Sequence, residues 1–526
     1  MAGHLGVPAQ GTILGSGLGA MPERELKLYI AESDLPKARA ALLAMAGRPR
    51  ASRSKLVTTY YDTPGDALRE RELMLRVRKQ GRRFIQTVKA HDPSGADMLE
   101  RGEWEDRVRG AVPDLDAPHS GGHVRAAVAS DELKPLFTTI VERTAFMLQP
   151  RQDTEIEVAI DRGAIEVPNG GSEPIREIEL ELKRGDTVVL WDVALRLREI
   201  VPCRIGTRSK GERGYALARG ERTAPPVLRA HKVALDRKML LDDALQAAGR
   251  RFIAIILRNE AAACGGVAEG VHQMRVAIRR LRAVMSSMRR MLPPEHYRWA
   301  NGELKWIGGA LGSARNWDVF AENLVGPLEG ALADEPELEP LAHAAERHRG
   351  KAYDDVRAVI ASERYTESIM RLARWFEARG WRDQPVNEAS ARLVASLRKV
   401  APALLRRLHR KTRKGARHFA HLPPQERHKL RIALKKLRYA IEFLEPIYGK
   451  RAVQRYMRRL KPLQDGLGHE SDVRAAHALA AALAGDGGKV ERAGGVVFGW
   501  YSRALRDSEK ETRKRVRRFR RVPSFW

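Results

Sequence analysis

The chain of 526 residues has little cysteine, few aromatic residues and no long apolar segment. Its two cysteines, Cys203 and Cys264, match no metal-ligand spacing, so neither a disulfide framework nor a zinc site is indicated, and a reducing compartment fits. No apolar run approaches the roughly 20 residues that span a bilayer. We therefore expect a cytoplasmic protein without a membrane partner.

Aromatic residues make up 6% of the chain and are nearly missing from its most basic helices. Proteins that bind single-stranded nucleic acid usually stack bases on aromatic side chains placed among the cations. The composition therefore argues against nucleic acid as a partner.

The formal net charge of +29 is unevenly distributed. Residues 1–220 contain 34 Lys or Arg against 32 Asp or Glu, whereas the remaining residues contain 61 against 34. Nearly all the excess charge lies in the second part. That part is expected to attract a polyanion, which could be a phosphate polymer, nucleic acid or an anionic membrane surface.

Two kinds of hydrophobic periodicity divide the chain. From Pro22 to about Arg219, short runs alternate charged and aliphatic side chains, as β-strands with one charged face do. From Leu235 to Lys514 the pattern is that of long amphipathic helices, with a helix break expected at residues 310–318. Predicted strands cover residues 73–80, 83–90, 101–108, 154–161 and 176–185, and predicted helices in the same part cover residues 34–47 and 193–200.

The expected fold class is α+β multidomain. The N-terminal part should be a closed antiparallel β-barrel with flanking helices, whose charged strand faces line an interior channel. The C-terminal part should be an all-α, duplicated helical bundle. The expected boundaries are a disordered leader at 1–20, a barrel domain at 21–220, a linker at 221–233, a helical domain at 234–515 with repeats at about 234–390 and 391–515, and a basic tail at 516–526.

The duplication is visible in two helices with a cationic stripe. In the first, four cations or histidines fall within about 80° of arc, opposite an apolar face. The pattern returns 156 residues later, and the same offset relates Lys305 to Lys461. Like charges so arranged repel, so a linear polyanion with closely spaced phosphates would match them. A solvated Arg-rich face is the simpler alternative for one helix, but retention of the stripe in both copies argues against it. The stripes are His272, Arg275, Arg279 and Arg282, and then His428, Arg431, Lys435 and Arg438.

Motifs in the N-terminal part resemble those of a known family, in an ordered set that covers about 195 residues. The first is E-x-E-x-K, formed by Glu23, Glu25 and Lys27. The others are YYDT at 60–63, LRVR at 75–78, TVK ending at Lys89, RGEWE at 101–105, ERT at 142–144, the E-x-E of Glu155 and Glu157, EIELELK at 177–183 and SKGERGY at 209–215. This part is similar to a CYTH domain, the fold of the triphosphate tunnel metalloenzymes.

The resemblance implies hydrolysis of inorganic triphosphate with Mg²⁺ or Mn²⁺ as cofactor. One metal ion would bridge phosphate oxygens and another could activate the attacking water. For a single residue such as Glu103 or Glu105, a structural salt bridge is an equal alternative. The implied triphosphate ligands are Lys27, Arg76, Arg78, Lys89, Arg143, Lys183, Lys210 and Arg213; the implied metal ligands are Glu23, Glu25, Glu179 and Glu181; and the implied catalytic residues are Glu23, Glu25, Lys27, Glu155 and Glu157.

The second part is similar to a CHAD domain, a duplicated helical bundle associated with polyphosphate binding. The residues that carry this resemblance are the two stripe helices, LGSARNWDV at 311–319 and LQDGLGHESDV at 463–473. Asn316 stands where the family usually has an acidic residue, which leaves the role of that position open. The resemblance implies that both stripes, with Lys305 and Lys461, bind polyphosphate, and that the protein could associate with polyphosphate granules.

Several other functions fit the same residues. The barrel could prefer thiamine triphosphate or cyclise ATP, as some relatives do. From a different class, the chain could be a noncatalytic scaffold at polyphosphate granules, or a nucleic-acid-binding protein with a vestigial barrel.

Overall fold

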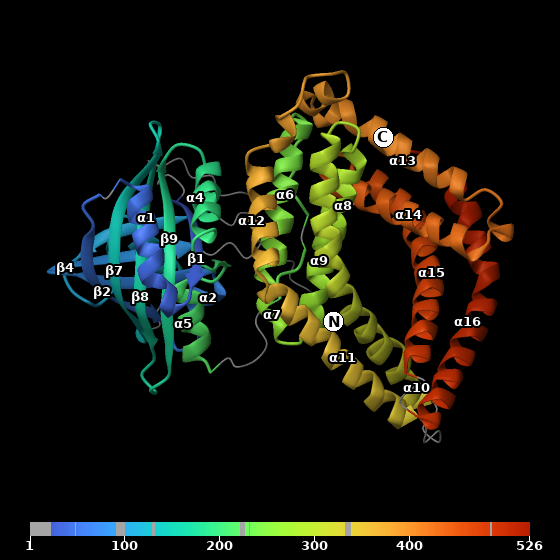
Figure 1. The fold of residues 1–526 in the computed structure, drawn as a ribbon, viewed down its shortest axis with the longest axis horizontal. Coiled ribbons are helices and arrows are strands. Elements are labelled where there is room, and N and C mark those ends of the chain that lie inside the picture. The colour runs from blue at the N-terminus through green and yellow to red at the C-terminus, as the bar shows by residue number, and fades with distance from the viewer. Residues whose placement is uncertain are drawn as a thin grey trace, which may run out of the picture.

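The computed structural model describes residues 23–47, 49–90, 100–128, 132–220, 227–230, 232–331, 338–483 and 487–526. The predicted leader and most of the predicted linker lie outside these residues. The chain forms a sheet-containing part up to residue 220 and a helical part from residue 241 onward, which lie side by side (Figure 1).

The sheet consists of antiparallel strands whose sequences alternate aliphatic and charged residues. Two of the predicted strands, at 73–80 and 83–90, have the bounds that the alternation gives them. The strands β2, β7 and β10 were not among those predicted from the alternation. The strands are β1 (Glu23–Ile30), β2 (Ser52–Asp62), β3 (Leu73–Gln80), β4 (Arg83–Ala90), β5 (Glu100–Arg101), β6 (Glu103–Val108), β7 (Lys134–Arg151), β8 (Thr154–Glu166), β9 (Ser172–Arg184) and β10 (Cys203–Gly206).

The prediction of a closed barrel is wrong. The strands follow the order β10-β1-β9-β8-β7-β2-β3-β4-β6, and in the described part of the chain the end strands β10 and β6 do not pair. One edge of β1 pairs with β9. Its other edge is divided between β10, opposite Lys27–Ile30, and the two-residue β5, opposite Glu23 and Arg24. At this end of the sheet the chain thus reaches β1 only through the two residues of β5, and within the described residues the longer strand β6 that follows does not pair with it.

Helices cover the aliphatic face of the sheet. Leu26 and Leu28 of β1 are buried in one apolar cluster with Ile178 of β9 and with Val189 and Leu190 of α4. The charged residues between them in sequence point to the opposite face of the sheet. The helices of this part are α1 (Leu35–Met45), α2 (Ala67–Glu70), α3 (Gly121–Val128), α4 (Val188–Arg198) and α5 (Lys210–Ala218), with a short 3₁₀ segment at Glu32–Asp34.

The helical part repeats one helix pair, as the sequence predicted. The stripe helices are α8 and α14, and each is followed by a long helix, α9 or α15. In Figure 1 these helices, with α11, α13 and α16, follow the outline of the helical part. The helices are α6 (Leu241–Arg258), α7 (Glu260–Cys264), α8 (Ala268–Met288), α9 (Pro294–Phe320), α10 (Gly326–Ala331), α11 (Leu338–Ala361), α12 (Glu363–Glu377), α13 (Leu397–Gly415), α14 (Pro424–Leu444), α15 (Lys450–Ala482) and α16 (Gly488–Arg520), and a π-helical segment at Ala321–Val325 joins α9 to α10.

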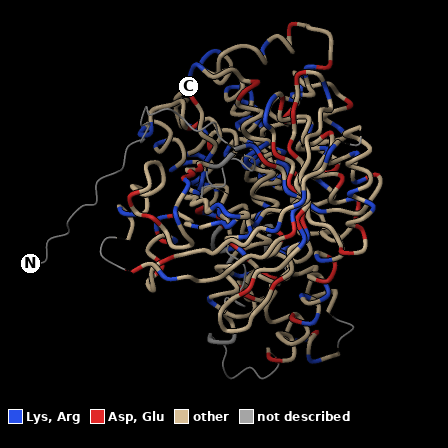
Figure 2. Tube along the Cα trace, turned by 90° about the vertical axis from the view of Figure 1, so that its left-hand side faces the viewer, with Lys and Arg blue, Asp and Glu red and all other residues tan. Residues whose placement is uncertain are grey.

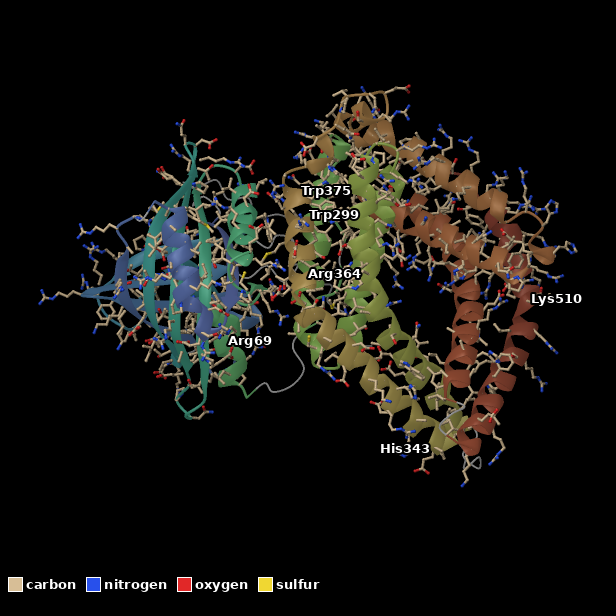
Figure 3. The ribbon with its side chains drawn as sticks, in the orientation of Figure 1. Arg69, Trp299, His343, Arg364, Trp375 and Lys510 are labelled. Atoms are coloured by element: carbon tan, nitrogen blue, oxygen red, sulfur yellow. The ribbon has the colours of Figure 1, made fainter. Side chains whose placement is uncertain are left out.

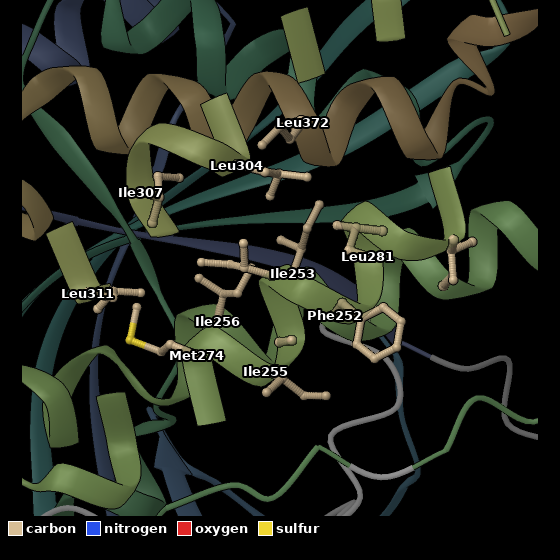
Figure 4. Packing of buried hydrophobic residues seen from close by; sticks show 14 of the residues in the cluster. Phe252, Ile253, Ile255, Ile256, Met274, Leu281, Leu304, Ile307, Leu311 and Leu372 are labelled. Carbon is tan, nitrogen blue, oxygen red and sulfur yellow. The ribbon is translucent and has the colours of Figure 1, made fainter. Parts of the chain in front are cut away.

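The helix break predicted at residues 310–318 does not occur, because α9 continues through this segment to Phe320. Leu311, Ala314 and Trp317 are buried at helical spacing on one face. Their packing against neighbouring helices stabilises a segment whose glycine and polar residues suggested a loop. Figure 4 shows this core around Phe252, Ile253 and Ile256 of α6, Met274 and Leu281 of α8, and Leu304, Ile307 and Leu311 of α9.

The two parts meet where α4 of the first packs beside α12 of the second (Figure 1). The helix α12, which carries Arg364 and Trp375, forms the edge of the helical part nearest the sheet (Figure 3). Arg198 pairs with Glu367 across this interface at 3.2 Å, and Arg374 pairs with Asp192. Within the described ranges, every helix is too short or too polar to cross a lipid bilayer.

Candidate functional site

A cavity of about 540 Å³ lies against the charged face of the curved sheet. Strands β1 to β4, β6 to β9 and the start of α5 contribute to it. Figure 2, in which the sheet-containing part faces the viewer, shows positions of both signs of charge along the strands. Of the residues predicted for the site, Glu25, Lys27, Arg76, Arg78, Lys89, Arg143, Glu157, Glu179, Glu181, Lys183 and Lys210 line the cavity.

Strand register arranges the acidic residues in rows across β8, β9 and β1. Glu181 of β9 is paired with Glu25 of β1 on one side and with Glu157 of β8 on the other. Residues paired across antiparallel strands project from the same face of the sheet. Glu25, Glu181 and Glu157 therefore form a row of three carboxylates, which we call the carboxylate row.

A second acidic group, in the next rows of the same strands, is covered by cations. Glu179 is paired in register with Lys27, and Glu177 with Asp161. The ammonium group of Lys27 lies 2.7 Å from Glu179 and 3.2 Å from Glu177. The ammonium group of Lys210 lies 2.7 Å from Asp161, 2.5 Å from Glu177 and 2.8 Å from Glu179.

These buried contacts fix the charges of the cluster. Burial lowers the pKa of Lys27, but Glu177, Glu179 and Glu25 outweigh burial and raise it well above its usual value. Burial raises the pKa of Glu179, but Lys210, Lys27 and Arg143 outweigh burial and hold it well below its usual value. Both groups are therefore charged at neutral pH.

Two sets of carboxylates could hold a metal ion. Oxygens of Asp161, Glu177 and Glu179 lie within 4.8 Å of one another, but Lys27, Lys210 and Arg143 already contact these groups. The carboxylate row is more open, with side-chain exposures of 23% for Glu25, 33% for Glu157 and 29% for Glu181. Its partner Lys183 is 38% exposed. Three carboxylates on one face fit the oxygen ligands that Mg²⁺ and Mn²⁺ prefer.

On the other side of the cavity, β3 and β4 carry basic residues and no acidic ones. Arg76 and Lys89 share Glu103, at 3.3 and 2.8 Å, and Arg78 lies 3.5 Å from Glu105. Burial lowers the pKa of the Arg78 guanidinium, and the charge of Arg76 lowers it further, despite the nearby glutamates. An anion placed between the two walls would relieve this repulsion.

Three predicted residues are placed differently. Glu155 does not line the cavity but pairs with Arg184 at 3.3 Å, because a β-bulge between Glu155 and Ile156 shifts the register. Arg213 does not line it either, since its guanidinium bonds Glu173 at 2.6 Å and Glu177 at 3.2 Å. Glu23 lies in β1, but its side chain is outside the described residues.

Asp161 was not among the predicted site residues, although it lies fully buried at the site. The available signal was the alternation in β8, where Glu155, Glu157 and Asp161 occupy positions two or four residues apart. Ala159 interrupts the charged series, so the motif was read only as far as Glu157.

In the helical part, α8 and α9 bring four basic side chains together. Burial, followed by the charges of Arg279 and Arg315, lowers the pKa of Arg275 to about 10. Burial and then Arg315 also lower the pKa of His272. The Nε atoms of Arg275 and Arg279 are buried without a hydrogen-bond partner in the described part of the chain. We call His272, Arg275, Arg279 and Arg315 the α8 cluster; it has more cations than nearby anions can balance.

The side chains of the second stripe, on α14, differ from one another in exposure, whereas three side chains of the first stripe share the α8 cluster. Arg438 bonds Glu442 at 2.7 Å, and Glu442 also lies 3.6 Å from Arg280 of α8. Burial lowers the pKa of Lys436, and Lys411, Arg282 and Arg289 lower it further. Of the other predicted residues, Arg431 and Lys435 are half-buried on α14, whereas His428, Lys305 and Lys461 are exposed.

A pocket of about 390 Å³ joins the two repeats near these residues. Lys232, Arg280, Arg438 and Lys461 line it together with two glutamates. Arg438 of the second stripe therefore lies at a pocket that it shares with Arg280 of α8 and Lys461 of α15.

Comparison with protein families defines the class to which these two sites belong. Residues 21–215 match the CYTH domain, and residues 247–481 match the CHAD domain. The chain therefore contains a CYTH domain followed by a CHAD domain, as the motifs indicated.

The individual relatives match parts of the chain. An inorganic triphosphatase of Haemophilus influenzae is 32% identical over 162 residues, which are 31% of this chain and 46% of the relative, so the match spans about half of that protein. The CHAD domain from the plant Ricinus communis is 25% identical, with a TM-score of 0.49, and the match covers 56% of this chain and 96% of that one. PptA from Streptomyces chartreusis is 18% identical, with a TM-score of 0.40, and the match covers 53% of this chain and 99% of that one.

Proposed function

We propose that the CYTH domain hydrolyses inorganic triphosphate to pyrophosphate and phosphate with Mg²⁺ or Mn²⁺, and that the CHAD domain binds polyphosphate. The observation that carries the first proposal is the opposition of two walls in one cavity. The carboxylate row lies on one side, and Arg76, Arg78 and Lys89 lie on the other. A linear triphosphate between them would have cations along one side and metal ligands along the other.

Different residues of the cavity would bind the phosphate groups and the metal ion. Arg76, Arg78, Lys89 and Arg143 carry the donors that would hold phosphate oxygens, and the arginines can do so with two parallel hydrogen bonds each. Glu25, Glu157 and Glu181 would hold the metal ion. A bound Mg²⁺ or Mn²⁺ supplies charge neutralisation at the phosphate oxygens and lowers the pKa of a bound water.

Supporting contacts would keep these groups in place. Lys27 contacts Glu25 at 3.1 Å as well as Glu179, so it fixes one ligand of the carboxylate row. Glu157 stands at the β8 end of the row and contacts Lys183 at 3.1 Å. Besides holding the metal ion, Glu157 would position the attacking water, while Glu177 and Asp161 would hold Lys210.

The proposal for the CHAD domain rests on the α8 cluster. A solvated Arg-rich face would leave its guanidinium groups in water, whereas Arg275 and Arg279 have buried Nε atoms and repel each other. A polyanion would compensate this charge. Binding to long-chain polyphosphate, and association with polyphosphate granules, would follow from the same property.

The competing substrates require a different cavity. Thiamine triphosphate and ATP carry rings that proteins hold by aromatic or apolar contacts. Among the described lining residues, Tyr60 is the one aromatic side chain, and it is buried against Phe137. Apolar side chains such as Leu56, Met74 and Val141 also line the cavity, so the preference for a substrate of phosphate groups rests on its many charged side chains and on the lack of a second aromatic ring among the described lining residues.

The test is phosphate release from triphosphate, pyrophosphate, ATP and thiamine triphosphate, each with and without Mg²⁺. The expected result is metal-dependent release from triphosphate that exceeds release from the other three. Preferential cleavage of thiamine triphosphate or ATP would replace the proposed substrate. Absence of release from all four would favour a noncatalytic phosphate-binding role.

A further inference from the structure

The start of α5 forms part of the cavity wall. Ser209, Lys210 and Gly211 line the cavity, and Lys210 reaches Asp161, Glu177 and Glu179. The position of the Lys210 ammonium group therefore depends on how firmly the first turn of α5 is held.

A capping box holds this turn. The hydroxyl of Ser209 accepts a hydrogen bond from the backbone N–H of Glu212 at 3.1 Å, and one carboxylate oxygen of Glu212 accepts from the backbone N–H of Ser209 at 2.7 Å. Arg208 donates to the backbone carbonyl of Glu212 at 3.1 Å. Such reciprocal bonds satisfy the free N–H groups at the start of a helix.

The other carboxylate oxygen of Glu212 accepts from Arg258 at 2.9 Å. Arg258 is the last residue of α6 and belongs to the CHAD domain. Both side chains are largely shielded, with exposures of 22% for Arg258 and 18% for Glu212. A shielded ion pair is screened less by salt than a pair at the open surface.

We propose that Arg258 is a positioning residue for the cavity: through Glu212 it fixes the first turn of α5 and hence Lys210. This inference rests on the proposed triphosphate site and extends it, because it makes the CHAD domain a structural part of that site. Two other ion pairs across the interface involve no residue of the cavity wall. Arg374 and Arg198 join α12 to α4, which does not contribute to the cavity.

The experiment compares Arg258→Ala with Arg374→Ala as a matched control in the full chain. Each variant removes one arginine of the CHAD domain from the interface, but only the first touches the cap of α5. For Arg258→Ala we expect KM for triphosphate to rise about tenfold with kcat changed less than threefold. Arg258→Lys, which keeps the charge but loses the fork of donors, should recover part of the loss. Arg374→Ala should leave KM at the wild-type value.

A second readout does not need turnover. Hydrogen exchange of the backbone amides at residues 210–218 should accelerate in Arg258→Ala and stay unchanged in Arg374→Ala. Equal KM values and equal exchange in the two variants would overturn the inference. If the wild-type protein released no phosphate from triphosphate, the proposed function would fail, while the exchange of α5 would still decide whether Arg258 holds its first turn.

Discussion

At the scale of single residues, the acidic groups of the cavity differ in the charges that surround them. Asp161, Glu177 and Glu179 are in contact with Lys27, Lys210 and Arg143, so their charge is already compensated. In the carboxylate row, Glu25 contacts Lys27, and Glu157 and Glu181 contact Lys183, which is itself 38% exposed. The binding free energy of a divalent ion should therefore be more favourable at the carboxylate row than at Asp161, Glu177 and Glu179, whose charges are already compensated.

The first prediction concerns the central member of the row. Replacing Glu181 by Gln removes one charged metal ligand while keeping the side-chain shape, so the rate of triphosphate hydrolysis should fall by about 10²-fold or more. Glu155→Gln serves as the control, because Glu155 lies on the same sheet but outside the cavity. Initial rates of phosphate release check both variants, and an equal loss in Glu155→Gln would contradict the assignment.

The second prediction uses the lowered pKa of Glu179. A carboxyl group with a depressed pKa in the folded state stabilises the fold above its unfolded pKa of about 4.3, and this contribution is lost as pH falls toward the lower value. Glu179→Gln should therefore reduce the free energy of unfolding by about 3 kcal/mol at neutral pH, since it removes the carboxylate that Lys27, Lys210 and Arg143 all contact and leaves an excess of buried positive charge. Urea denaturation at pH 7 and pH 3 should show the difference between wild type and variant shrinking in acid. A difference that stays constant would count against this ion cluster.

At the scale of helices and strands, the hydrophobic periodicity of short segments predicted many of the elements. The bounds of β3 and β4 followed from alternation, because each strand has one face in the core and one in the cavity. The open edge of the sheet and the continuity of α9 did not follow, since both depend on partners distant in sequence. The family resemblance implied Arg213 as a triphosphate ligand, whereas its guanidinium bonds Glu173, a partner that the motif does not include.

The third prediction concerns the repulsion within α8. Arg275 and Arg279 lie one turn apart, and like charges at this spacing destabilise a helix by about 0.5 kcal/mol. Arg279→Met should therefore raise the free energy of unfolding slightly while weakening polyphosphate binding. Arg371→Met is the control, because Arg371 is exposed on α12 and pairs with Glu367 at 3.3 Å. Denaturation and titration with polyphosphate check both effects, and a loss of stability without loss of binding would argue for a structural role.

At the scale of the whole molecule, the two parts of the chain differ in how their charges are distributed. The sheet part balances its charges and concentrates carboxylates in one cavity, whereas the helical part carries nearly all the excess positive charge. Exposed cations also lie outside the proposed sites, as Lys510 on α16 does (Figure 3). The parts are nevertheless docked through a shared apolar core and interface ion pairs.

The fourth prediction tests whether the two parts bind their ligands independently. Charge reversal at both Arg275 and Arg431 should weaken retention of long-chain polyphosphate and reduce its salt dependence, because fewer counterions are released on binding. Triphosphate hydrolysis should stay within about twofold of wild type, since neither residue lies near the cavity. Parallel loss of both properties would mean that the two domains form one site.

The most direct test of the account is the position of Mn²⁺ in crystals grown with a non-hydrolysable triphosphate analogue, read from anomalous scattering. We expect a peak between the carboxylates of Glu25, Glu157 and Glu181, with the analogue extending toward Arg76, Arg78 and Lys89. A peak at Asp161, Glu177 and Glu179, or no Mn²⁺ in the cavity while the analogue is bound, would contradict it.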